Sequence, residues 1–346
     1  MAIQTRKERF DTLAPDEPAY RWKQFTAALF DPAYSCWSDV AVLPKILREK
    51  IQTTIPWLCV TESIVQQSAK QDTFKALLEV EDGNKIETVL MQNPRGAWTI
   101  CVSSQVGCAM RCVFCATGKM GLIRNLTSDE IIDQYRFWMA FLKKHPELPT
   151  RISNIVFMGM GEPMANYSCV RDAIQTIITH TSIGETRITV STVGVLPRLE
   201  KLLNDPNWPH VRLAISLHSA DPETRKRIVP TSYDDFLPAL SDWAKRYLKK
   251  FGNRRHHLTF EYVMLRGVND SLQHAKALVD FVSQIGHIRV NLIPYNFTDG
   301  GLQCSTSKGL EDFFAYLDTH GLTVTKRRTM GEDIAAACGQ LYATKK

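Results

Sequence analysis

The sequence predicts an α/β fold in which a helix-covered parallel sheet curves into an open, partial (βα)6 barrel. From residue 97 onward, short runs rich in β-branched residues alternate with segments of helical periodicity. The strand-like runs are apolar almost throughout, which is typical of parallel strands buried on both faces. Six such units are too few to close an eight-stranded barrel, so the barrel is expected to stay open.

The expected strands and helices follow one another in strict order. The strand runs are AWTICVSS, RISNIVFMGMG, TRITVSTVG, VRLAISLHS, HHLTFEYVML and IRVNLIPYN. Helical periodicity predicts helices over 128–144, 168–180, 196–204, 235–251, 271–284 and 308–319. Chemistry in such barrels takes place at the carboxyl ends of the strands. The residues just after each strand are therefore the candidate site residues.

The first 95 residues have a different pattern. Residues 16–53 carry apolar positions at helical spacing, which predicts two or three short helices. Residues 73–92 form two semi-alternating runs around Asp82-Gly83-Asn84, a strong hairpin signal. We expect a helical accessory domain over 1–60, a β-hairpin linker over 61–95 and a core domain over 96–346.

Composition indicates a globular protein of the cytoplasm. Hydrophobic residues make up 44% and charged residues 23% of the chain, which is ordinary for a globular protein. No apolar run approaches the roughly 18 residues that span a bilayer, and the first residues have no signal-peptide core. We therefore expect no membrane partner, and we expect reduced thiols rather than disulfide staples.

The charge is compatible with a polyanionic partner. The formal net charge is +6, and nucleic acid is one partner that such a balance suits. The basic residues gather in five groups: Arg6, Lys7 and Arg9; Arg21 and Lys23; Lys45, Arg48 and Lys50; Lys249, Lys250, Arg254 and Arg255; Lys326, Arg327 and Arg328. Each group alone indicates a solvated face, whereas several groups on one side of the fold would form a basic surface that can bind RNA.

The stretch CVSSQVGCAMRCVFCATGKMG holds the most informative residues. Cys108, Cys112 and Cys115 have C-x3-C-x2-C spacing directly after the first core strand. On a helix they would form a buried stripe. A structural zinc site would need a fourth ligand and a second pair. Three thiolates on a glycine-rich loop suit an iron–sulfur cluster with one iron left open.

This loop, with Phe114 before the last cysteine, resembles that of radical S-adenosylmethionine (SAM) enzymes. The resemblance implies a 4Fe-4S cluster held by the three cysteines. SAM would bind the open iron through its amino and carboxylate groups. The fold of that superfamily is the partial barrel predicted above.

Further motifs resemble the RlmN/Cfr family of RNA methyltransferases, from about residue 17 to residue 342. They are CVSSQVGC, CATG, RNLT, GMGEP, ISLH, VNLIPYN and DIAAACGQL, in this order. The resemblance implies that Cys338 takes a methyl group from one SAM, that a second SAM supplies the radical, and that the methyl carbon joins adenine. Cys101 would then form a disulfide with Cys338 and release the product, while Glu87 would accept the ring proton.

The same framework implies the SAM contacts, each at a strand end: Gly161, Glu162, Ser191, Ser216, Leu217, His218 and Asn296. A glycine permits close backbone approach, and a carboxylate can receive the SAM ammonium group. Cys36, Cys59, Cys169 and Cys304 match no family position and are expected to be structural.

The family divides by the adenine atom that is methylated. RlmN-type members make 2-methyladenosine at adenosine 2503 of 23S rRNA, some also at adenosine 37 of tRNA. Cfr-type members methylate C8 and confer antibiotic resistance. Pro163, Pro294 and RTMGEDI resemble RlmN, whereas EPAYRWKQFTAALF and VLPKILREKI resemble Cfr. The motifs nearest the expected site favour C2.

The implied partners are protein-poor 23S rRNA, tRNA and a flavodoxin-type electron donor, with the N-terminal domain binding RNA. Two other function classes remain open at the level of sequence. A radical SAM activating enzyme that acts on protein would lack Cys101 and Cys338. An RNA-binding module with a structural metal would be colourless and contain zinc.

Overall fold

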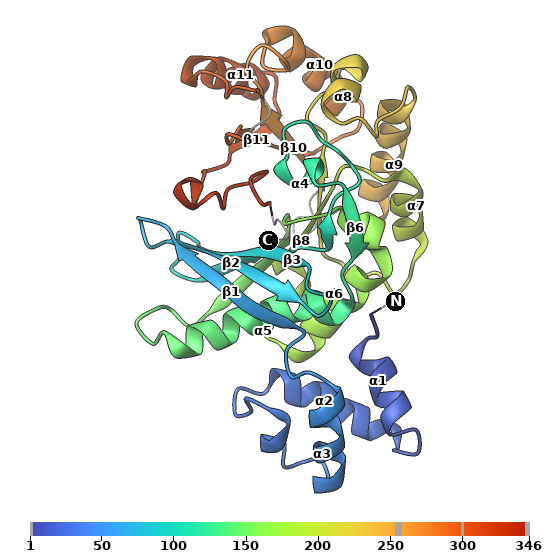
Figure 1. Ribbon diagram of the computed structural model, residues 1–346. Coiled ribbons are helices and arrows are strands. Elements are labelled where there is room, and N and C mark those ends of the chain that lie inside the picture. The colour runs from blue at the N-terminus through green and yellow to red at the C-terminus, as the bar shows by residue number, and fades with distance from the viewer. Residues whose placement is uncertain (1–2, 253–257, 299–300, 343–346) are drawn as a thin grey trace.

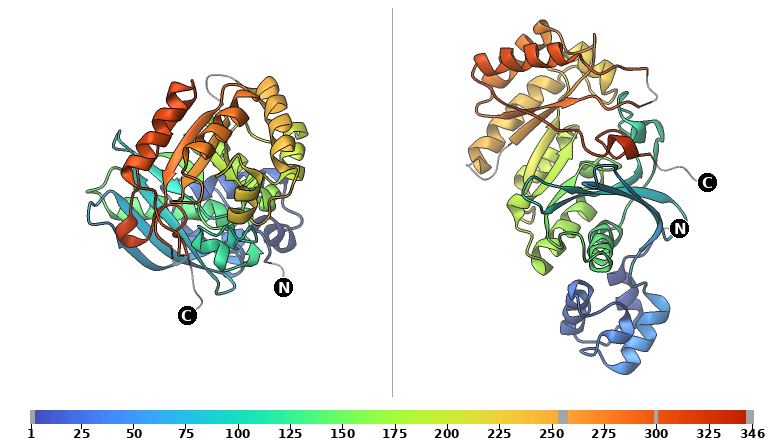
Figure 2. Two further views of the ribbon diagram at one scale, coloured as in Figure 1. Left: turned by 90° about the horizontal axis from the view of Figure 1, so that it is seen from above. Right: turned by 90° about the vertical axis from the view of Figure 1, so that its left-hand side faces the viewer.

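The computed structural model describes residues 3–252, 258–298 and 301–342, so Arg254 and Arg255 lie outside the described residues. A ten-stranded sheet in the order β1-β2-β3-β4-β7-β8-β9-β10-β11-β12 organises the molecule (Figure 1). Helices cover its outer face, and a helical lobe formed by the N-terminal residues stands apart (Figure 2). No helix among the described residues is long and apolar enough to cross a membrane.

The predicted α/β partial barrel is confirmed. Its parallel strands are β4 (Trp98–Cys101), β7 (Ile152–Phe157), β8 (Ile188–Thr192), β9 (Arg212–Ser216), β10 (Leu258–Met264) and β11 (Arg289–Pro294). One observed strand lies within each predicted run. A further strand, β12 (Thr323–Lys326), pairs parallel with β11. The sequence did not predict it, because it is short and half-exposed.

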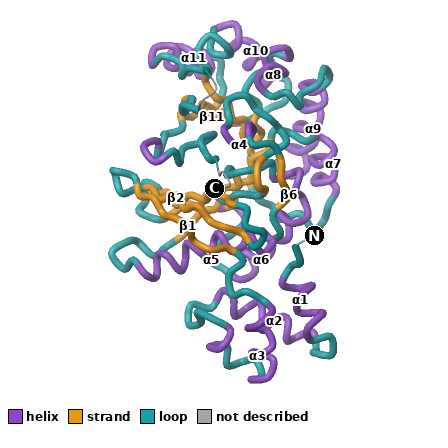
Figure 3. Tube along the Cα trace, viewed as in Figure 1, coloured by secondary structure: helices purple, strands orange, loops and turns teal. Residues whose placement is uncertain are grey.

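The six core helices begin and end within one residue of the predicted bounds. They are α5 (Ser128–Lys144), α6 (Tyr167–His180), α7 (Leu196–Asn204), α9 (Phe236–Phe251), α10 (Leu272–Ser283) and α11 (Ser307–Thr319), and they lie outside the strands (Figure 3). The predicted and observed bounds agree because each helix is determined by its own local sequence. Each carries an amphipathic stripe, and α5 also begins with a capping box between Thr127 and Glu130. The short helices α4 (Ala116–Lys119) and α8 (Pro222–Ile228) were not predicted.

The predicted hairpin consists of β2 (Thr73–Val80) and β3 (Lys85–Gln92), and Gly83 in its turn has φ +75°. Because β3 pairs antiparallel with β4, the hairpin continues the main sheet rather than only linking two domains. The strand β1 (Val60–Gln67) pairs with β2 and forms the sheet edge. Most of its side chains are exposed, so it lacks the alternation that predicts a strand.

A separate small sheet carries the cysteine-rich loop. It is made of β5 (Gln105–Gly107) and β6 (Leu122–Asn125), paired antiparallel. The two ends of the cysteine-rich loop, which connects these strands, therefore lie side by side.

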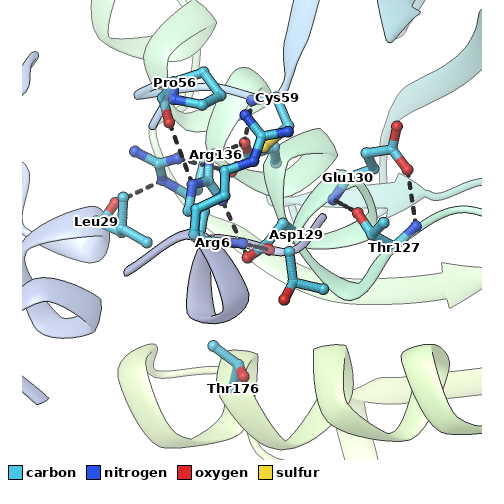
Figure 4. Close-up of polar contacts among 12 residues, drawn as sticks. Arg6, Leu29, Pro56, Cys59, Thr127, Asp129, Glu130, Arg136 and Thr176 are labelled. Atoms are coloured by element: carbon cyan, nitrogen blue, oxygen red, sulfur yellow. Dashed lines mark hydrogen bonds and ion pairs between the residues drawn. The ribbon is translucent and has the colours of Figure 1, made fainter. Parts of the chain in front are cut away.

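The N-terminal lobe has a core of its own. Its helices α1 (Arg6–Leu13), α2 (Ala19–Phe30) and α3 (Lys45–Thr54) and the turn Trp37–Asp39 pack around Phe25 and Trp37. Buried charges connect this lobe to α5 (Figure 4). Arg6 bonds Asp133 and, at 3.3 Å, Asp129, and Arg136 bonds Asp133 at 2.7 Å and the Leu29 carbonyl at 2.7 Å.

Candidate active site

The loop of Cys108, Cys112 and Cys115 is closed at its base by glycines. The Cys108 amide donates to the Gly121 carbonyl at 2.8 Å. Gly107 has φ +75°, and a Cβ there would lie 1.9 Å from the Gly121 oxygen, so only glycine fits. A helix begins only after Cys115. The cysteines therefore belong to a loop, and the alternative of a helical stripe is excluded.

All three cysteines line one cavity of about 150 Å³, which we call the cluster cavity. Among the described residues, no three His, Cys, Asp or Glu side chains form a group that could hold one metal ion. An iron–sulfur cluster takes its thiolates on different irons, so its ligands stand farther apart than those of a single ion. Three thiols around a shared cavity fit such a cluster.

Burial governs the protonation of these thiols. It raises the pKa of Cys108 to about 12, with smaller contributions from Glu162 and Cys115, and it raises the pKa of Cys112 and Cys115 as well. Without a nearby cation the three groups would remain thiols. Iron would stabilise the thiolates, which is the ordinary coupling between metal binding and deprotonation.

Gly161 and Glu162 lie at the end of β7 and line the cluster cavity. Gly161 has φ +101°, and a Cβ there would lie 2.5 Å from the side chain of Gln105. The Glu162 carboxylate accepts the amides of Met164 and Val193, both at 2.9 Å, while burial raises its pKa. The amides fix a carboxylate at the cavity wall, where it can accept an ammonium group.

Ser191, Ser216 and His218 line the same cavity. The two serine hydroxyls are 3.2 Å apart. His218 has φ +59°, and its Nδ1 accepts the Val263 amide at 3.1 Å, so the proton of the neutral ring is on Nε2. Burial, together with the charge of Arg225, lowers the pKa of His218 to about 3. It is a neutral donor at physiological pH.

Two further residues that are expected to contact SAM have side chains that do not line the cluster cavity. The Leu217 side chain is fully buried in the main core and does not line the cluster cavity. Asn296 lines a second cavity instead, where its side-chain amide donates to the Cys338 carbonyl at 3.0 Å.

The second cavity, of about 370 Å³, is lined by Cys101 and Cys338, and we call it the thiol cavity. Cys338 also lines the cluster cavity, as do Met158, Ile293 and Arg327. Burial, together with the neighbouring Cys338, raises the pKa of Cys101 to about 12, while Arg327 opposes the shift. The structure thus brings Cys101 and Cys338 together, both as free thiols.

The C-terminal residues 331–342 hold Cys338 in place between the hairpin and the cysteine-rich loop (Figure 2). On the loop side, the Ala116 amide donates to Gly339 at 2.8 Å and the Thr117 hydroxyl to Leu341 at 2.6 Å. On the hairpin side, Lys75 donates to the Ala335 carbonyl at 3.3 Å. Contacts on both sides therefore position this thiol.

Glu87 lines neither cavity. Its buried carboxylate forms an ion pair with Lys75 at 2.9 Å and accepts the Tyr342 amide at 2.8 Å. Burial raises its pKa, while Lys75 and the Tyr342 amide lower it. Glu87 is thus neither an exposed strand residue nor, in this arrangement, in contact with the thiol cavity.

Sequence reasoning missed Arg327. It belongs to the run of Lys326, Arg327 and Arg328, which resembles a solvated basic surface. The structure instead turns Arg327 inward, 3.7 Å from Glu261 and 3.1 Å from the Met158 sulfur. The two thiols and Glu261 together raise its pKa, although burial opposes them. Its position directly after a strand was the available signal, but β12 itself was not predicted.

Comparisons with known proteins agree with this geometry. Residues 102–281 match the model of the radical SAM superfamily. The dual-specificity RNA methyltransferase RlmN of Alcanivorax borkumensis is 42% identical, over 82% of this chain and 74% of that protein. The ribosomal RNA large subunit methyltransferase N of Nitrosopumilus maritimus is 39% identical, over 93% and 92%. A radical SAM methyltransferase structure from Sphaerobacter thermophilus superposes with a TM-score of 0.88 at 36% identity, covering 98% of this chain and 97% of that one.

Proposed function

Because the chain belongs to the radical SAM superfamily and, within it, to the RlmN family of RNA methyltransferases, we propose that it makes 2-methyladenosine in RNA. The substrate is adenosine 2503 of 23S rRNA in a protein-poor state, with adenosine 37 of tRNA as a second target. The name of the Alcanivorax relative, a dual-specificity RNA methyltransferase, supports two RNA substrates. The enzyme is cytoplasmic, with a flavodoxin-type electron donor.

The observation that carries this proposal is the position of Cys338 on the boundary of two cavities. One cavity has the three loop cysteines and Glu162, which suit a 4Fe-4S cluster and SAM. The other has Cys101 and room for a base. A thiol that faces both can receive a methyl group on one side and deliver it on the other.

The residues of the chain have separate roles in this reaction. When bound, the cluster and two SAM molecules per turnover supply a methyl group and a carbon-centred radical. Gly161, Glu162, Ser191, Ser216 and His218 hold SAM, and the Leu217 backbone lies among them. Asn296 orients the Cys338 backbone. Cys338 carries the methyl group as S-methylcysteine.

Release of the product needs a second thiol and a base. After the methylene carbon has joined adenine, the adduct must lose one electron, which the oxidised cluster would accept, and its ring proton. The Cys101 thiolate then attacks the Cys338 sulfur: the S–S bond forms, the bond between that sulfur and the methylene carbon breaks, and the carbon keeps the bonding pair and takes a proton to become the methyl group. Glu87 accepts the ring proton once the Tyr342 amide has left its carboxylate. A raised pKa suits this carboxylate to accept a proton.

Nucleoside mass spectrometry tests the proposal. We expect 2-methyladenosine to be missing from the rRNA and tRNA of cells that lack this gene. A plasmid that carries the gene should restore the modification. Restoration of 8-methyladenosine instead would assign the Cfr-type reaction. Unchanged nucleosides in both RNA classes would overturn the proposal.

A further inference from the structure

The inward faces of β9, β10 and β11 form three layers along the barrel axis. Because alternate residues of a strand share a face, the inward residues are Arg212, Ala214 and Ser216 on β9, Thr259, Glu261 and Val263 on β10, and Arg289, Asn291 and Ile293 on β11. The layer at the carboxyl ends lines the cluster cavity. The other two layers line a third cavity of about 310 Å³, which we call the arginine cavity.

The layer at the amino ends is cationic and lacks acidic partners. Within the part of the chain that the structure describes, the side chains of Arg212 and Arg289 in this layer, and of Arg187 on the turn before β8, make no hydrogen bond or ion pair, and Arg212 Nε is buried without a partner. Burial lowers the pKa of Arg212, and the charges of Arg187 and Arg289 lower it further. These cations repel one another.

The acid deeper in this cavity does not relieve that repulsion. Glu261 accepts the Asn291 side-chain amide at 2.9 Å and lies 3.7 Å from Arg327, which also lines the cavity. Its charge is therefore matched by Arg327. Barrel interiors are usually filled with branched apolar side chains. Arg187 and Arg289 are exposed to solvent, but Arg212 is half-buried and its Nε has no partner, so desolvation of this guanidinium is costly unless an anion compensates it.

We propose that the arginine cavity binds a phosphate group. Arg212 and Arg289 supply guanidinium donors at its outer layer, and the hydroxyls of Thr189 and Thr259 line the same space. Guanidinium groups are well suited to phosphate oxygens. The cavity shares Met158 and Arg327 with the thiol cavity. The phosphate is therefore either part of an RNA strand that reaches the thiol cavity or a free phosphate compound.

Titration calorimetry of the full-length protein with inorganic pyrophosphate at low salt tests this site. We expect binding to the wild type, about tenfold or more weaker binding to Arg212→Ala and to Arg289→Ala, and none to the double variant. The matched control is Arg198→Ala, which removes the same charge from the exposed face of α7 and should bind normally. Equal affinity in all variants, or no binding to the wild type, would overturn the proposal.

Folding controls separate binding from structure. Arg212→Ala removes a cation without a partner, so its melting temperature should equal or exceed that of the wild type. A large decrease would mean that Arg212 is structural and would count against the site. Competition with a short single-stranded RNA identifies the source: displacement of pyrophosphate assigns an RNA phosphate, and its absence assigns a free phosphate compound. Because no methylation is measured, the result is independent of the proposed reaction.

Discussion

Cys101 and Cys338 share a cavity, yet only Cys338 also lines the cluster cavity. This asymmetry predicts different failures for their alanine variants. Cys338→Ala should form no covalent RNA species, because it lacks the thiol that we propose carries the methyl group. Cys101→Ala should still join Cys338 to adenine and then stall, giving a protein–RNA crosslink that survives denaturation. A denaturing gel with labelled RNA measures both.

A control variant and two contrary outcomes test the roles assigned to Cys101 and Cys338. Cys304→Ala, at an exposed cysteine outside both cavities, should turn over without a crosslink. A crosslink in Cys338→Ala rather than in Cys101→Ala would reverse the two roles. Normal turnover by both variants would show that they are buried structural thiols.

The loop cysteines lead to a second prediction at the residue scale. Cys108→Ala, Cys112→Ala and Cys115→Ala should each lose iron and the brown absorption near 400 nm, because the loop offers no fourth thiol at the right spacing. Iron content after anaerobic reconstitution measures this without any assay of activity. Cys169→Ala, on an outer helix, is the matched control and should load iron normally. Full iron loading by any loop variant would contradict its assignment as a ligand.

At the scale of elements, α1 is joined to α5 by buried charges (Figure 4). Burial opposes ionisation of Asp133, but Arg6 and Arg136 outweigh it and hold its pKa below the usual range. Arg6→Ala should lower the free energy of unfolding by about 3 kcal/mol, because a buried carboxylate loses one of its two cations. Urea denaturation measures the change.

Lys7→Ala is the control one residue away. Its ion pair with Asp11 is exposed, so its removal should change stability by about 0.5 kcal/mol or less. A loss equal to that of Arg6→Ala would mean that the buried contact of Arg6 is not the cause of the effect, since alanine itself favours the helix.

At the scale of the whole molecule, the net charge of +6 predicts salt-dependent RNA binding. With about four to six phosphate contacts, the logarithm of the association constant should fall with log salt at a slope of roughly −3 to −5. Filter-binding measurements at salt concentrations from about 50 to about 300 mM, a range around physiological ionic strength, give this slope. A slope near zero would mean that the basic groups are only a solvated surface.

The parts of the fold that sequence predicted well have local causes. The six core helices carry their own amphipathic stripes, and the hairpin carries its own turn residues. The strands β1 and β12 were missed because they are short or exposed at sheet edges, where no burial imposes alternation. The pairing of β3 with β4 could not be predicted, since a hairpin signal does not say what its outer edge contacts.

The sequence alone determined the barrel class, the cysteine-rich loop and the resemblance that assigns the family, because each depends on short-range spacing. The tertiary structure alone decided that Cys338 reaches Cys101, that Arg327 turns inward and that Glu87 is paired with Lys75. These contacts depend on how residues 331–342 pack between the hairpin and the loop. Such packing joins segments far apart in the chain, and its free energy comes from burial and hydrogen bonds that no local pattern records.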